Sequence, residues 1–150
     1  MNARRTSFRR IAAVGLAGLA LAGLGACTRT PKPIPVLMYH GLAADPGHDV
    51  WTVATDEFRR QVADLKAAGY RTILPADLEK RHRWKLGFVR KPILITFDDG
   101  LRSVLTEAEP ILREAGFRAT AYLILSTIAD APAERRQYRQ ADCLVWPEVR

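Results

Sequence analysis

Beyond residue 33, apolar residues gather in four short segments that have the pattern of strands, at residues 34–40, 71–74, 92–97 and 117–125. The segment at 92–97 begins with a continuous apolar run that contains two isoleucines and is bounded by a Lys-Pro pair, which is typical of a strand buried on both faces of a parallel sheet. Between the runs, apolar residues recur every three or four positions, which predicts helices. Strands that alternate with helices predict an α/β fold with a parallel sheet or a (β/α) barrel.

Residues that favour helix ends delimit these helices. Thr55 is the expected N-cap of the first helix, and Gly69 is expected to stop it. Pro75 begins the second helix. In the third helix, residues 101–115, the apolar pattern contains Pro110, so we expect a kink or a division there.

The remaining segments are polar or contain turn residues. Residues 41–53 and 81–91 are expected to be loops, and residues 129–140 a loop or a loose helix. Residues 144–150 have the pattern of the beginning of another helix. Four strands are too few to close a barrel, so we expect the chain to be the first part of a larger domain.

The N-terminus predicts export. Four arginines precede residues 11–26, an uncharged run of 16 residues rich in Ala, Leu and Gly, as in a signal peptide. The run ends in a sequence that resembles the lipobox of bacterial lipoproteins, in which the cysteine is lipidated: Leu24-Gly25-Ala26-Cys27. We therefore expect a lipoprotein signal peptide at 1–27, a tether at 28–33 and a globular part at 34–150. A plain transmembrane anchor, or a secretory signal with an incidental cysteine, remains an alternative.

Charge and cysteine content agree with an envelope protein. The net charge is +7, but from residue 28 onward there are 19 basic and 16 acidic residues, which gives no reason to expect a nucleic-acid partner. Lipid on Cys27 would hold the protein at a bacterial membrane, facing the periplasm or the exterior. Cys143 would then have no disulfide partner in the chain, and we expect a small buried side chain.

Two adjacent carboxylates, Asp98 and Asp99, follow the buried run at 92–97, and Gly100 follows them. The loops at the carboxyl ends of strands are where α/β folds collect their chemistry. One carboxylate can bind a divalent cation while the other accepts a proton from water. The alternative is that Asp-Asp-Gly is only a turn, because Asp and Gly are common turn residues.

The sequence around the acid pair resembles that of the polysaccharide deacetylases, the NodB-homology or carbohydrate esterase 4 family. Its first motif is similar to Thr96-Phe97-Asp98-Asp99-Gly100. The opening of the globular part is similar to the branch that deacetylates poly-N-acetylglucosamine, whose members are often lipoproteins: Pro35-Val36-Leu37-Met38-Tyr39-His40. Segments at 69–73, 119–122 and 146–150 match the same framework, so the resemblance covers residues 34–150. It implies an incomplete (β/α) barrel of the polysaccharide deacetylase type.

The resemblance implies that the protein is a hydrolase, with Asp98 as the general base and Asp99 as a ligand of a divalent metal, with zinc the first candidate. The substrate would be an N-acetylated polysaccharide that contains N-acetylglucosamine. His40, at the end of its strand, is a candidate for the rim of the active site. The alternative for His40 is a hydrogen-bonded histidine beside the barrel mouth.

The chain also departs from the family. The family completes its metal site with a His-Ser/Thr-x-x-His motif, and here no two of His40, His48 and His82 are four residues apart. The expected position of that motif falls just past residue 150. Catalytic zinc normally has three protein ligands, so we expect the chain as given to be inactive, although its parent would be an enzyme.

Two other functions remain open. A glycoside hydrolase also uses two carboxylates, but adjacent acids on one turn do not flank a glycosidic bond from both sides. A non-catalytic envelope lipoprotein, either a remnant or a carbohydrate-binding module, would not need the missing histidines. Trp51, Trp84 and Trp146 could stack on sugar rings, or could simply pack in the core or at its rim.

Overall fold

The computed structural model describes residues 33–82 and 89–149. The predicted signal peptide, Cys27, Trp84 and most of the predicted tether therefore lie outside the described residues. Within the described ranges, the longest helix has 13 residues, and no helix has the length and apolar character that a membrane span requires.

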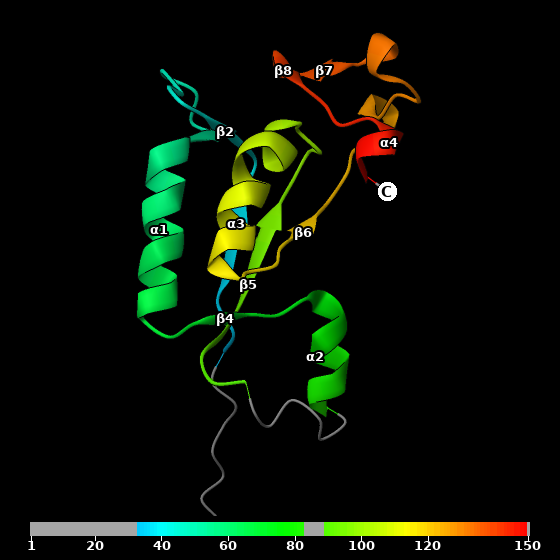
Figure 1. The fold of residues 1–150 in the computed structure, drawn as a ribbon. Coiled ribbons are helices and arrows are strands. Elements are labelled where there is room, and N and C mark those ends of the chain that lie inside the picture. Colours follow the sequence, from blue (N-terminus) through cyan, green and yellow to red (C-terminus); the bar gives the residue numbers. More distant parts are fainter. Residues whose placement is uncertain (1–32, 83–88, 150) are drawn as a thin grey trace, which may run out of the picture. The chain divides into compact units, whose positions relative to one another are not determined.

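Strand β5 (Pro92–Phe97) is the centre of the sheet (Figure 1). On one side it pairs with β1 (Val36–Tyr39). On the other side, β4 (Arg71–Thr72) pairs with its first two residues and β6 (Thr120–Ala121) with its last two. All three pairings are parallel, so the carboxyl ends of these strands share one edge. The predicted α/β fold with a parallel sheet is confirmed.

Helices α1 (Thr55–Ala67) and α3 (Glu109–Ala115) lie side by side on one face of this sheet (Figure 1). Alternate residues of a strand point to opposite faces, and Ile95 and Phe97 of β5 point to these helices. They belong to one apolar core, whose other buried members are Leu42, Phe58, Val62, Ala108, Ile111, Leu112 and Phe117.

Three aromatic rings join β1, α1 and β5 at the centre of this core. The ring of Tyr39 lies 5.1 Å from that of Phe58 and 5.6 Å from that of Phe97, measured between centroids. The Tyr39 hydroxyl donates a hydrogen bond to Gln61 Oε1 at 2.7 Å, and burial raises the pKa of this hydroxyl. The strand that precedes His40 is therefore fixed to a helix and to the central strand.

The opposite face of the sheet is more open. Register places Val36 beside Leu94 and Met38 beside Thr96, so these four residues share a face. Val36 and Met38 are 56% and 60% exposed. One row of apolar side chains on β1 is therefore left uncovered by the residues that the structure describes.

Helix α1 starts one residue earlier than predicted. Its N-cap is Ala54, without a side-chain hydrogen bond, so the prediction that Thr55 caps the helix is wrong. The Thr55 hydroxyl instead lies 3.4 Å from Glu107 Oε2. Gly69 ends this segment as predicted, with a φ of +81° that a glycine adopts easily.

The helical segment after β5 is divided at Pro110, as predicted. A π-helical turn covers Val104–Ala108, and α3 follows with Pro110 in its first turn, where a missing N–H leaves no intrahelical bond broken. Gly116 caps α3 with a φ of +72°.

Several segments between these elements differ from prediction. The loop expected at 41–53 contains two short parallel strands, β2 (Gly41–Ala43) and β3 (Thr52–Ala54). The strand expected at 117–125 is reduced to β6, and a single turn of 3₁₀ helix begins at Leu125.

The polar segments also gain some regular structure. Helix α2 (Pro75–His82) extends two residues further than expected, so His82 ends a helix and does not lie in a loop. Residues 129–140 contain a 3₁₀ turn (Pro132–Glu134) and strand β7 (Gln137–Tyr138), which forms a hairpin with β8 (Ala141–Asp142). Helix α4 (Trp146–Val149) follows as predicted.

We expect Phe58→Ala to lower the free energy of unfolding by about 3–5 kcal/mol, because it empties a fully buried site between α1 and the sheet. Urea unfolding followed by circular dichroism measures the change. Leu125→Ala is the control, since Leu125 is 68% exposed and should change stability by about 0.5 kcal/mol or less. Equal losses in the two variants would contradict the assigned core.

Candidate active site

The structure places the acid pair at the carboxyl end of the central strand. Asp98 continues the ladder beyond β5, because its backbone N–H donates to the Tyr39 carbonyl at 2.9 Å. Both Asp98 and Asp99 are half-buried. His40 directly follows Tyr39, so the end of β1 brings His40 to the same sheet edge as the two carboxylates.

The backbone reverses sharply at the acid pair. Asp99 and Gly100 both have a φ of +73°, in the left-handed region. For Asp99 this conformation costs about 1 kcal/mol, and such outliers collect at functional sites. A Cβ at Gly100 would lie 3.0 Å from Leu123 Cδ2, so a glycine is needed there for close packing as well as for backbone angle. Asp-Asp-Gly therefore does form a turn, as the alternative interpretation predicted, and this turn contains both carboxylates.

Residues 142–144 form hydrogen bonds to the backbone at and just after this turn. The Gly100 carbonyl accepts a hydrogen bond from Leu144 N at 2.9 Å, and the Asp142 carbonyl accepts one from Arg102 N at 2.7 Å. Between these bonds, Leu101 and Cys143 form an antiparallel bridge. Cys143 is fully buried with a free thiol, which confirms the small buried side chain that the sequence predicts.

The carboxylate of Glu148 anchors the same segment. Arg135 donates two hydrogen bonds to it, at 2.8 and 2.9 Å, and Arg102 Nε donates a third at 3.0 Å. The N–H of Val145 donates a fourth, at 3.2 Å. The bonds from Arg135 are the main cause that lowers the pKa of Glu148 to about 2. Sequence reasoning missed this network.

The three histidines lie in separate segments of the chain. The ring of His40 packs on that of Trp51, with 4.9 Å between centroids. His48 is exposed between β2 and β3, and His82 is the last residue of α2. A role for His40 at the rim of the active site stays a prediction.

The described residues do not fit a catalytic zinc ion by themselves. Among residues 33–82 and 89–149, no three His, Cys, Asp or Glu side chains gather in a group that could hold a metal. Catalytic zinc normally takes three protein ligands. The roles of Asp98 as base and Asp99 as metal ligand therefore stay predictions.

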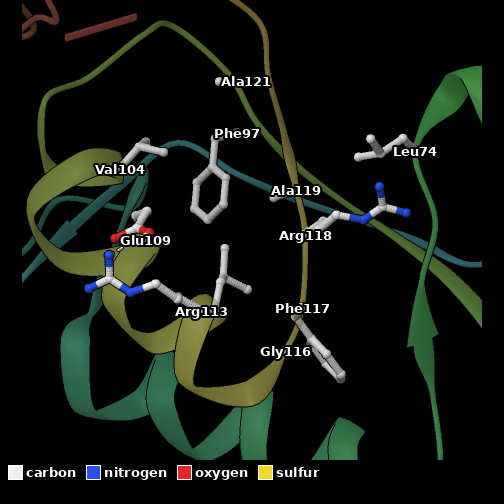
Figure 2. A pocket seen from close by; sticks show the side chains of 11 residues that line it. Leu74, Phe97, Val104, Glu109, Arg113, Gly116, Phe117, Arg118, Ala119 and Ala121 are labelled. Carbon is white, nitrogen blue, oxygen red and sulfur yellow. Dashed lines mark ion pairs between the residues drawn. The ribbon is translucent and has the colours of Figure 1, made fainter. Parts of the chain in front are cut away.

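An apolar cavity of about 570 Å³ lies elsewhere, between α3 and β6 (Figure 2). Phe97, Leu112 and Phe117 are among its lining residues, and the ion pair between Glu109 and Arg113 lies at its border. Phe97 belongs to the helix-covered face of the sheet. Neither carboxylate of the acid pair lines this cavity, so it is separate from the candidate active site.

Comparison with known proteins finds similarity to polysaccharide deacetylases. The family model described as polysaccharide deacetylase matches residues 86–145. The chain is 32% identical to YxkH of Bacillus subtilis (strain 168) over 101 residues, which are 67% of this chain and 35% of that protein. It is 31% identical to the poly-beta-1,6-N-acetyl-D-glucosamine N-deacetylase of Escherichia coli (strain K12) over 106 residues, which are 66% of this chain and 16% of that protein.

The fold has counterparts among solved structures. The Streptococcus pyogenes deacetylase PplD, solved in complex with acetate, matches with a TM-score of 0.65 and 23% identity. The match covers 80% of this chain and 51% of PplD. The chain thus spans about half of this structure and about a third of YxkH.

We expect Gly100→Ala to destabilise the protein more than Gly69→Ala. Both glycines have positive φ, so both substitutions carry a backbone cost of about 1 kcal/mol. Only Gly100 has a close neighbour, because nothing lies within 4 Å of a Cβ at Gly69. Chemical unfolding of the two variants measures the difference, and equal losses would contradict the close approach of Leu123.

We expect Glu148→Gln to lower the free energy of unfolding at pH 7 by about 1–3 kcal/mol, because charge-assisted hydrogen bonds are lost. The pKa of Glu148 falls on folding from 4.5 to about 2. Its stabilisation is therefore fully present above about pH 4.5 and is lost as the pH falls through about 2.

Urea unfolding of wild type and variant between pH 7 and pH 2 checks this dependence. The control is Glu114→Gln, whose ion pair with Arg59 is exposed and should contribute about 0–1 kcal/mol. A gap between wild type and Glu148→Gln that stays constant down to pH 2 would refute the assignment.

Proposed function

Because this chain belongs to the polysaccharide deacetylase family, we propose that it supplies the general base and one metal ligand of a polysaccharide de-N-acetylase. The substrate of this proposal is a polymer that contains N-acetylglucosamine. One observation carries the proposal: the acid pair stands in a strained turn at the carboxyl end of the buried strand β5. The relative from Escherichia coli, whose name gives such a polymer as its substrate, supports the choice.

In this proposal, Asp98 accepts a proton from the water that attacks the carbonyl carbon of the acetamide group. The C–N bond of the amide then breaks, acetate leaves, and the nitrogen takes up a proton that balances the one accepted by Asp98 and remains on the sugar as an amine. The turn fixed by Tyr39 and Gly100 holds the carboxylate in place for this step.

We assign Asp99 to a divalent cation, with zinc as the first candidate. The remaining ligands would come from outside the described residues, since these do not complete a metal site. The chain spans about a third of YxkH. Activity is accordingly proposed for the whole protein and not for the described residues alone.

We also propose that the protein is a lipoprotein of the bacterial cell envelope. Support comes from the sequence, in which arginines, an uncharged segment at 11–26 and a lipobox-like ending precede Cys27. A lipid on Cys27 would hold the domain at the membrane surface, where an envelope or exported polysaccharide is within reach.

We expect Asp98→Asn to reduce acetate release from N-acetylglucosamine oligomers by about 10²–10⁴-fold, because the general base is lost. The assay uses the protein expressed from the complete gene, with zinc added. Asp56→Asn is the matched control, since Asp56 is an exposed acid in the first turn of α1 and should leave the rate unchanged. Full activity in Asp98→Asn would refute the role of Asp98, and no acetate release from the wild type would favour a non-catalytic protein.

We expect Cys27→Ser to abolish incorporation of radiolabelled palmitate in a bacterial host and to move the protein from the membrane fraction to the soluble fraction. Cys143→Ser is the control, because Cys143 is buried. Labelling of the Cys27→Ser variant would show that the lipobox reading is wrong.

A further inference from the structure

Trp51 lies at the surface near the carboxyl end of the sheet, although burial of a large aromatic side chain is favourable. Its side chain is 47% exposed, and the neighbouring Val50 is 85% exposed. Trp51 is absent from the apolar core formed by the described residues. Core packing therefore does not account for this tryptophan.

Trp51 contacts polar side chains from two distant segments. The ring centroid of His40, which precedes Trp51 in the chain, lies 4.9 Å from that of Trp51, and the two rings are tilted by 56°. Arg139, at the tip of the β7–β8 hairpin, places its Cζ 4.6 Å from the centre of the Trp51 ring. Arg139 also lies over the ring of Tyr138, at 5.4 Å. Such cation–π contacts stabilise an arginine on an exposed indole while its N–H groups stay available.

The backbone on both sides of this cluster is held in place. Asp49 accepts hydrogen bonds from Trp51 N at 3.1 Å and from the Thr52 hydroxyl, and Gly41 N donates to the Trp51 carbonyl at 3.3 Å. The opposing turn puts Arg139 and Gln140 at φ values of +50° and +65°. Two consecutive non-glycine residues with positive φ cost free energy, and strain of this kind collects at ligand sites.

The cluster adjoins the acid pair through short stretches of chain. Its member His40 follows Tyr39, whose carbonyl accepts the hydrogen bond from Asp98 N. A cavity of about 370 Å³ lies beside both regions: Thr52 and Gln140, which follow Trp51 and Arg139 in the chain, line it together with Leu101, two residues after Asp99. A ligand bound on Trp51 would lie at the same end of the sheet as the carboxylates.

We infer that Trp51, Tyr138, Arg139 and His40 form a carbohydrate subsite, which binds one pyranose ring of the N-acetylated polysaccharide beside the acid pair. This inference rests on the proposed function. The C–H face of a pyranose packs on the part of the indole that Arg139 and His40 leave exposed, and the guanidinium of Arg139 donates hydrogen bonds to its hydroxyl or acetamide oxygens. Sites for small ligands commonly combine aromatic surface with a few fixed polar groups in this way.

Calorimetric titration of the full chain, purified in detergent, tests the subsite with a β-1,6-linked N-acetylglucosamine pentamer as the probe. We expect Trp51→Ala to weaken binding about tenfold, because the stacking surface is lost. Arg139→Ala should weaken it about threefold, and Trp51→Phe should fall between wild type and Trp51→Ala. Circular dichroism of each variant checks that it is folded.

Tyr70 and Lys91 provide a matched control. They form a similar aromatic–cation pair, 5.9 Å apart, but at the amino ends of β4 and β5. Tyr70→Ala should leave the affinity for the pentamer unchanged. Equal affinities in folded wild type, Trp51→Ala and Trp51→Phe, or no binding by the wild type, would overturn the subsite.

Activity assays keep this outcome separate from that of the proposed function. Binding that depends on Trp51 without acetate release by the complete protein would support the subsite and contradict the deacetylase proposal. Acetate release with a KM unchanged by Trp51→Phe and Trp51→Ala would support the deacetylase and overturn the subsite.

Discussion

The pairing of β5 with β1, β4 and β6 determines where the acid pair lies in the fold. A strand with neighbours on both sides along its length must be apolar on both faces, and five of its six residues are buried. The pairing with β1 extends to the N–H of Asp98, so the first polar residue after the strand is placed by the sheet itself. The backbone reverses at Asp99 and Gly100, and Leu123 packs so close to Gly100 that a Cβ there would lie 3.0 Å from Leu123 Cδ2.

The parts of the fold that sequence predicts well are those with local causes. The apolar run of β5, the division of a helix at Pro110 and the helix ends at Gly69 and Gly116 each follow from nearby residues. The prediction that Thr55 is the N-cap was wrong by one residue. The hydroxyl of Thr55 contacts Glu107 and not the first turn of its own helix. Local capping rules do not contain that distant partner.

The candidate site shows the same division between local and distant causes. Asp98 and Asp99 stand out in sequence because they follow a buried strand within a motif similar to that of a known family. The Arg135–Glu148 pair and its link to Arg102 carry no such signal, since Arg102 and Glu148 are 46 residues apart. The stacking of Arg139 on Trp51 is equally hidden, because only the fold brings the β7–β8 hairpin to the β2–β3 ribbon.

We regard the acid pair as one part of a metal site that the described residues do not complete. Calorimetric titration of the 150-residue chain with zinc, in parallel with its Asp99→Ala variant, tests whether this chain binds the metal without further ligands. We expect that neither protein binds zinc with the affinity of a three-ligand site, because a single metal-binding carboxylate does not hold the ion tightly. Tight binding by the wild type that is lost in Asp99→Ala would contradict this expectation, and would mean that the chain completes a metal site by itself.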